Sequence, residues 1–344
     1  MSSAEPTATV EQIHAQSLIV EGHRDCYEQI RRLNEGEDDP LGRWLIPRLQ
    51  TGGVDILLYA VGGDSIAHSN GGDKRLLATL ENISALMDGL ARSEGRATLA
   101  LSKPDLPSQP DGTIRFVLHL EGGGPLEGSL AALESLFRLG VRSIQPAWNL
   151  RNELADGVRE SDTEGGLSRF GVAVLREMEQ LGMLVDLAHI SEAGFWHAIR
   201  STTRPLAVSH SNAKAVHDHP RNITDDQLKA IAERGGVVGV HALPVFVDES
   251  RPTIDRLVDH IAHMVGVAGI EHVGIGGDFV RNDGPRSARE QIPKRVVAEL
   301  DDLGEIDELP NLTAALFRRG FDENEVTALV GGNFVRLLLQ ILPD

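Results

Sequence analysis

Apolar residues in this chain gather into eight short runs rich in Val, Ile and Leu, with amphipathic segments of helical period between most of them. Short apolar runs of this kind are typical of strands buried on both faces of a parallel sheet. The predicted strands are SLIVEGH (17–23), GVDILLYAV (53–61), TIRFVLHLE (113–121), VRSIQPAW (141–148), GMLVDLAH (182–189), RPLAVSHS (204–211), GGVVGVHALP (235–244) and HVGIGGDF (272–279).

The segments between the strands predict helices, several of which end in glycine, as helix C-termini often do. They are residues 76–90, 128–140, 166–182, 191–203, 224–236, 253–269 and the last helix, 334–342. Regular alternation of strand and helix predicts parallel crossovers, and eight strands favour one α/β (β/α)8 TIM barrel over residues 1–344. No GxGxxG motif follows the first strand to favour a dinucleotide fold. We expect residues 1–16 to be a peripheral N-terminal extension and NGGDKR (70–75) to be a loop.

The composition and charge of the chain argue against several functional classes of protein. The 344 residues are 41% hydrophobic and carry a formal charge of −18, which argues against a binder of nucleic acid or of an anionic membrane. Cys26 is the only cysteine, so no internal disulfide forms. The polar start MSSAEPTATVEQ lacks the features of a secretory signal, and no stretch approaches the roughly 20 apolar residues of a membrane span. We therefore expect a cytoplasmic protein with a small-molecule partner; the oligomeric state stays open, a homodimer included.

Side chains with metal-binding chemistry stand where five of the predicted strands end. Functional groups of such barrels lie at the carboxyl ends of the strands, so these side chains are expected to meet. His23 and Asp25, separated by one residue, project the same way if the strand continues through them. The full set is His23, Asp25, Glu121, His189, His210 and Asp278.

Imidazoles combined with carboxylates are a ligand set suited to zinc and tolerated by manganese or cobalt, and the absence of further thiolates disfavours a structural zinc site. Three histidines and several carboxylates are too many for one open tetrahedral ion. Two ions about 3.5 to 4 Å apart, bridged by Glu121, would share them, hold a bridging hydroxide and polarise a carbonyl. Asp278 is then free to act as general base and later as general acid, which predicts hydrolysis.

Five segments together resemble the membrane (renal) dipeptidase family, peptidase family M19, within the amidohydrolase barrels. They are VEGHRDC (20–26), LHLEGGGPLEGSLAALESLFRLGVRSI (118–144), GLSRFGVAVLREMEQLGMLVDLAHISEAGFW (166–196), SHSNAKAVHDHPRNITDDQLKAI (209–231) and GIGGDF (274–279). The resemblance implies an amidohydrolase-like barrel and a zinc-dependent dipeptidase that releases two amino acids.

The resemblance also implies roles for single residues. One zinc would be bound by His23 and Asp25, the other by His189 and His210, and both by Glu121, with Asp278 moving the proton. The family's arginine that holds the substrate carboxylate falls on Arg221, whose guanidinium can grip a carboxylate at two points. TDDQ (224–227) is also a helix capping box, so this segment has a structural explanation as well.

The chain departs from the family in three segments. Trp148 stands where many members carry a histidine that stabilises the oxyanion; its indole N–H can bind substrate, and a packed aromatic wall is the alternative. Many members read Asp-Phe-Asp-Gly from the residue that aligns with Asp278, whereas this chain has Val280 and Arg281 in place of the second Asp and the Gly. His241 occupies a strand end where bacterial relatives often have Asn, and a substrate contact is its functional interpretation.

The departures leave a second function open, in which the same metal pair hydrolyses another small amide, a lactam or an ester. A metal-binding protein without turnover would be expected to lack the proton shuttle, yet Asp278 is present.

Asp186 is either an acceptor that orients a ligand histidine or part of a neighbouring polar layer. Cys26 is not expected to be a nucleophile, because metal hydrolases activate water.

Overall fold

Nine parallel strands form the centre of the computed structural model, which describes residues 9–64, 74–279 and 299–344. The strands are β1 (Ile19–Asp25), β2 (Val54–Gly63), β3 (Ala97–Leu99), β4 (Ile114–Glu121), β5 (Val141–Ile144), β6 (Leu184–Val185), β7 (Ala207–Val208), β8 (Val237–Val240) and β9 (Val273–Ile275). Eight of them coincide with the eight predicted runs, because each run is buried along almost its whole length.

The strands follow one another around a barrel. One sheet has the order β1-β2-β4-β5-β6, a second has β7-β8-β9, and every pairing is parallel. A bridge between Asp186 and Ala207 joins the two sheets. At the opposite edge the backbone N–H of Gly277, beyond β9, donates to Glu21 Oε1 of β1 at 2.6 Å. The predicted (β/α)8 arrangement is confirmed.

Strand β3 was not predicted. It pairs with the first residues of β4, outside the main strand order, and Thr98 at its centre is exposed. A strand of three residues with one exposed position has no apolar run from which to be predicted.

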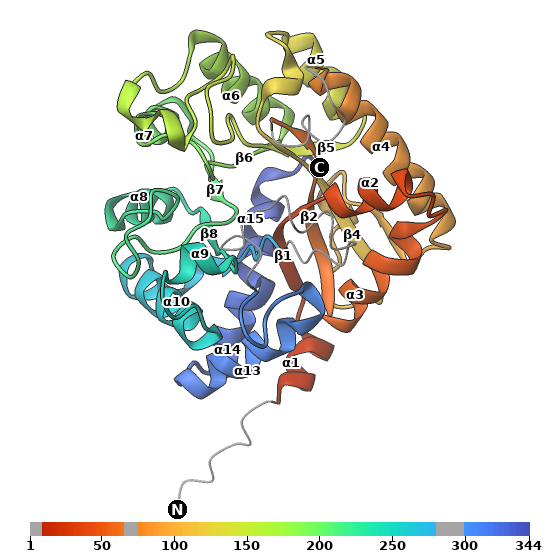
Figure 1. The fold of residues 1–344 in the computed structure, drawn as a ribbon, viewed down its shortest axis with the longest axis vertical. Helices are drawn as coiled ribbons and strands as arrows, with labels where there is room; N and C mark the ends of the chain where they lie inside the picture. The colour runs from red at the N-terminus through yellow and green to blue at the C-terminus, as the bar shows by residue number, and fades with distance from the viewer. Residues whose placement is uncertain (1–8, 65–73, 280–298) are drawn as a thin grey trace, which may run out of the picture.

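Helices surround the strands (Figure 1). They are α1 (Val10–Gln16), α2 (Tyr27–Asn34), α3 (Ile46–Thr51), α4 (Arg75–Arg92), α5 (Leu130–Arg138), α6 (Arg169–Leu181), α7 (Glu192–Ser201), α8 (Asp225–Glu233), α9 (Pro244–Val247), α10 (Ile254–Ala268), α13 (Leu309–Arg319), α14 (Glu323–Thr327) and α15 (Asn333–Ile341). All seven predicted helices are present. Five of them start at a serine or threonine whose hydroxyl accepts a backbone N–H of the first turn: Ser129, Ser168, Ser191, Thr224 and Thr253.

Helix α15 packs onto one end of the barrel interior, where Figure 1 shows it at the middle of the ring of strands. Its Phe334 and Leu337 share a buried cluster with alternate residues of β2, Ile56 and Leu58. The intervening Leu57 and Tyr59 belong to the larger core beneath the surrounding helices. The strands are therefore apolar on both faces, which leaves their carboxyl ends as the place for polar chemistry.

Residues 10–16 pack on the fold as helix α1, with Ile13 buried and His14 Nε2 at 2.9 Å from Thr313 Oγ1 of α13. The predicted loop 70–75 lies mostly outside the described residues. Among the helices of the described ranges, none combines the length and apolarity that a bilayer crossing requires.

Candidate metal centre

The structure brings all six predicted ligand and shuttle residues to the carboxyl ends of the strands. His23 and Asp25 lie within β1 and Glu121 ends β4. The other three follow strand ends within a few residues: His189 after β6, His210 after β7 and Asp278 after β9. Residues separated by up to 255 positions thus share one site.

His23 lies among three carboxylates. Its Nε2 is 3.6 Å from Glu121 Oε1, 3.8 Å from Asp25 Oδ1 and 3.9 Å from Asp278 Oδ1. These separations exceed direct hydrogen bonding and leave room for a cation between the groups.

Glu121 also faces the two other histidines. Its Oε1 is 3.1 Å from His189 Nε2 and 3.8 Å from His210 Nε2. The two imidazole nitrogens are 2.8 Å from each other. One carboxylate oxygen therefore lies within 4 Å of a nitrogen of all three histidines, the position that a bridging ligand needs.

The donor set fits a divalent metal by two observations. The ligand atoms of His23, Glu121 and His210 lie within 4.8 Å of one another, and so do those of His23, Asp25 and Asp278. Both ring nitrogens of His23, together with Asp25 Oδ1 and Asp278 Oδ1, are buried without a hydrogen-bond partner among the described residues. Unpaired buried polar atoms are costly, and a cation between His23 Nε2 and Asp25 Oδ1 would satisfy those two atoms.

The protonation of the cluster suits ligation. Burial lowers the pKa of both His189 and His210 well below its usual value, so these imidazoles are neutral and can bind metal. Burial raises the pKa of Asp25 to about 6, against the opposing charge of His23. Burial likewise raises the pKa of Asp278, but the hydrogen bond and charge of His241 outweigh it and bring the value to about 2. Asp278 is therefore ionised at neutral pH.

Polar neighbours fix the orientation of the two neutral histidines. His189 Nδ1 is 3.0 Å from Asn149 Oδ1, and His210 Nδ1 is 2.8 Å from Ser209 Oγ. Such contacts leave the Nε2 atoms to face the site.

Asp186 belongs to a buried polar layer, as one of its two interpretations expected. Its carboxylate accepts from the Ser209 backbone N–H at 2.8 Å and from Gln145 Nε2 at 2.9 Å. These bonds position Ser209, and through it the neighbouring His210, so Asp186 acts on this predicted ligand only indirectly.

Two site residues adopt backbone conformations that non-glycine residues rarely take. His189 has φ of 65° and Asp278 has φ of 51°. Such conformations persist only where the surroundings hold them, and they are concentrated at functional sites. The Val158 N–H donates to the His189 carbonyl at 2.7 Å, and the bond from Gly277 to Glu21 holds the residue before Asp278.

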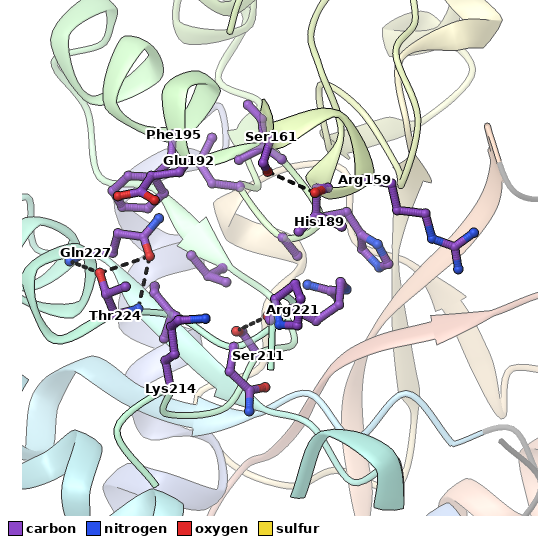
Figure 2. Close-up of a pocket in the computed structure, with 18 of the residues that line it drawn as sticks. Arg159, Ser161, His189, Glu192, Phe195, Ser211, Lys214, Arg221, Thr224 and Gln227 are labelled. Atoms are coloured by element: carbon purple, nitrogen blue, oxygen red, sulfur yellow. Dashed lines mark hydrogen bonds between the residues drawn. The ribbon is translucent and has the colours of Figure 1, made fainter. Parts of the chain in front are cut away.

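A cavity of about 420 Å³ opens beside the cluster, and its lining includes both His189 and Arg221 (Figure 2). Arg221 is 9% exposed; its Nη2 makes a long 3.4 Å contact to the His210 carbonyl, and its Nε has no partner among the described residues. Burial lowers the pKa of Arg221 to about 10, against the charges of Glu121 and Asp278, so it stays cationic at neutral pH. The guanidinium of Arg221 can therefore bind an anion in the cavity.

The capping box at Thr224 and Gln227 is also present, so the segment both starts α8 and carries Arg221 to the cavity. Trp148 is partly exposed, with its ring centroid 5.8 Å from that of His189. This contact places the indole beside the cluster, in a position to form a wall of the site.

His241, predicted to contact substrate, lies with Nε2 at 3.0 Å from Asp278 Oδ2.

Cys26 is buried, and burial raises the pKa of its thiol well above the usual value, which disfavours a nucleophilic thiolate. Val280 and Arg281, where the chain departs from the Asp-Phe-Asp-Gly pattern, lie outside the described residues.

Sequence reasoning missed two buried residues beneath the cluster. His119 Nδ1 is 2.9 Å from Ser143 Oγ, and its ring makes an edge contact with that of His23. Glu21 accepts from the backbone N–H of His23 at 3.2 Å, and burial raises its pKa to about 8. Each residue stands two positions before a predicted ligand, so the two-residue period of a strand was the signal that could have found it.

The chain is similar to several known proteins in sequence and in structure. A family model described as membrane dipeptidase (peptidase family M19) matches residues 7–342. An uncharacterized protein in the pqqA 5' region of Klebsiella pneumoniae is 33% identical over 272 residues, covering 76% of this chain and 95% of that protein. Dipeptidase verJ of Clonostachys rogersoniana is 32% identical over 265 residues, covering 76% of this chain but only 65% of verJ.

Two solved structures share the architecture. An amidohydrolase from Pseudomonas aeruginosa superposes with a TM-score of 0.83 at 24% identity, covering 97% of this chain and 99% of that one. A metallo peptidase from Rhodobacter sphaeroides, liganded with a phosphinate mimic of the dipeptide L-Ala-D-Ala, gives 0.80 at 25% identity, covering 95% and 99%. The amidohydrolase-like fold is therefore confirmed.

Proposed function

Because the chain belongs to the membrane dipeptidase family, peptidase family M19, we propose that it hydrolyses the peptide bond of small dipeptides at a pair of divalent metal ions, with zinc as the preferred metal. Manganese or cobalt would be accepted by the same nitrogen and oxygen ligands. The Rhodobacter sphaeroides neighbour was solved with a mimic of a dipeptide, which supports this class of substrate.

The observation that carries the proposal is the meeting of three histidines with Glu121 at the barrel mouth, within 4 Å of one carboxylate oxygen. His23 and Asp25 would hold one ion, His189 and His210 the other, and Glu121 would bind both. When bound, the ions would lower the pKa of a shared water and polarise the scissile carbonyl.

The chain's own residues would do the remaining work. Asp278 would take the proton of the attacking water; as the water oxygen joins the carbonyl carbon and the C–N bond breaks, it would pass that proton to the leaving amine. Arg221 would bind the free carboxylate of the dipeptide from the cavity side, and Trp148 would line the site beside His189.

The test is metal analysis of the purified protein together with hydrolysis of a dipeptide library. We expect two divalent ions per chain, loss of activity with a chelator and recovery with zinc. No more than one ion in the fully loaded protein would refute the two-metal site. Cleavage of a lactam, an ester or an N-acyl compound without cleavage of any dipeptide would replace the dipeptidase by the second candidate hydrolase.

A further inference from the structure

The two oxygens of the Asp278 carboxylate have different surroundings. Oδ2 is 3.0 Å from His241 Nε2, whereas Oδ1 faces the cluster, 3.9 Å from His23 Nε2, with no hydrogen-bond partner among the described residues. An ionised carboxylate only accepts, so His241 must carry its proton on Nε2 and donate it. One oxygen is held and the other is left free on the side of the predicted metal ligands.

His241 is itself rigidly held. Its backbone N–H donates to Asn212 Oδ1 at 3.0 Å, and Asn212 Nδ2 donates back to the His241 carbonyl at 2.8 Å. The next N–H, of Ala242, donates to the Gly277 carbonyl at 3.0 Å, directly before Asp278. The imidazole is 2% exposed and packs against Phe246 with ring centroids 4.6 Å apart. The donor and the carboxylate are therefore tied together through backbone as well as side chain.

Asp278 needs such support, since its φ of 51° is unfavourable for a residue with a Cβ. A carboxylate in this position could otherwise rotate and turn either oxygen toward the site. General base catalysis depends on one oxygen lying within hydrogen-bond reach of the proton it removes.

We propose that His241 is a positioning residue, which by donating Nε2–H to Oδ2 holds the Asp278 side chain so that Oδ1 faces the nucleophilic water. This inference rests on the proposed function for the identity of the reaction. It differs from a substrate contact by His241, because a positioning residue acts on the rate of the chemical step rather than on substrate binding.

The experiment compares His241→Leu, which removes the donor, with His241→Gln, whose amide nitrogen can replace Nε2. We expect His241→Leu to lower kcat by about 10- to 100-fold, the usual range for residues that orient a reacting group, with KM changed less than about threefold. His241→Gln should recover most of kcat. A rise in KM at unchanged kcat, or equal loss in both variants, would overturn the proposal.

Coupling to Asp278 gives a second readout. In an Asp278→Asn background, His241→Leu should lower the remaining kcat by less than about twofold, because the group that it positions is already lost. Full additivity of the two losses would contradict the proposal.

Crystal structures of the two His241 variants separate this inference from the proposed function. If the wild-type protein cleaves no dipeptide, the proposed function fails. The conformation of the Asp278 side chain in these structures still tests the positioning role of His241. We expect its rotamer to change or disorder in His241→Leu and to be retained in His241→Gln. An unchanged, ordered Asp278 in His241→Leu would refute the positioning role.

Discussion

Arg221 offers the sharpest test of the substrate. We expect a dipeptide with a free C-terminal carboxylate to be cleaved far better than the same dipeptide with a C-terminal amide. The reason is that Arg221 is a buried cation whose donors are largely unused: Nε has no partner among the described residues, and Nη2 makes only the 3.4 Å contact to the His210 carbonyl. Replacing Arg221 by Met should abolish this preference.

The magnitude follows from the burial of the guanidinium. A hydrogen bond to a charged group is worth about 1.5–3 kcal/mol, which corresponds to roughly 10- to 150-fold in kcat/KM. At 9% exposure, water cannot replace a missing carboxylate well, so the amide should leave a poorly solvated charge unpaired. We therefore expect the free acid to be favoured by the upper part of this range.

The assay measures kcat/KM for both substrates with the wild-type protein and three variants. Arg221→Met removes the charge, Arg221→Lys keeps the charge without the planar fork, and Arg159→Met is the matched control. Arg159 lines the same cavity but is exposed, so its loss should leave the acid-to-amide ratio within about twofold. Arg221→Lys should keep a smaller preference than the wild type.

Two results would refute this reasoning. Equal cleavage of the free-acid dipeptide and its C-terminal amide by the wild type would show that no buried cation binds the C-terminal carboxylate of the substrate. A preference that survives in Arg221→Met but disappears in Arg159→Met would transfer the role to the exposed arginine.

Three further predictions concern the ligands, the base and the fold. Glu121→Ala should lower the bound metal to less than one ion per chain, whereas His189→Ala should mainly empty one site; equal metal content in both, measured by elemental analysis, would contradict the bridge. Asp278→Asn should reduce kcat by roughly 10² to 10⁴-fold with KM and metal content little changed; near wild-type turnover would pass the proton transfer to another residue. Burial raises the pKa of Asp55 to about 6, so its proton is held more tightly in the folded state, and the free energy of unfolding should fall as pH rises from about 4 to 6. Asp55→Asn keeps an acceptor for the Ile19 N–H and should reduce this dependence in urea titrations; an unchanged pH dependence would refute the shift.

Much of the fold could be predicted because each barrel strand is a local apolar run and five of the seven predicted helices begin at a serine or threonine cap. Thr224 illustrates this: its hydroxyl and Gln227 form the capping box that the four letters TDDQ already indicate. Strand β3 could not be predicted in this way, since it exists only because β4 offers an unpaired edge along its first residues.

The sequence by itself determined which chemistry is available and at which strand ends it stands, because strand termini and ligand types are local properties of the chain. Only the tertiary structure decided which atoms meet, since the distances between strand ends depend on how the barrel closes. It brought Glu121 within reach of three histidines and turned His241, far along the chain from any ligand, onto Asp278. It also imposed the left-handed backbone of His189 and Asp278, a conformation that neither residue favours alone and that the packed ends of the strands sustain.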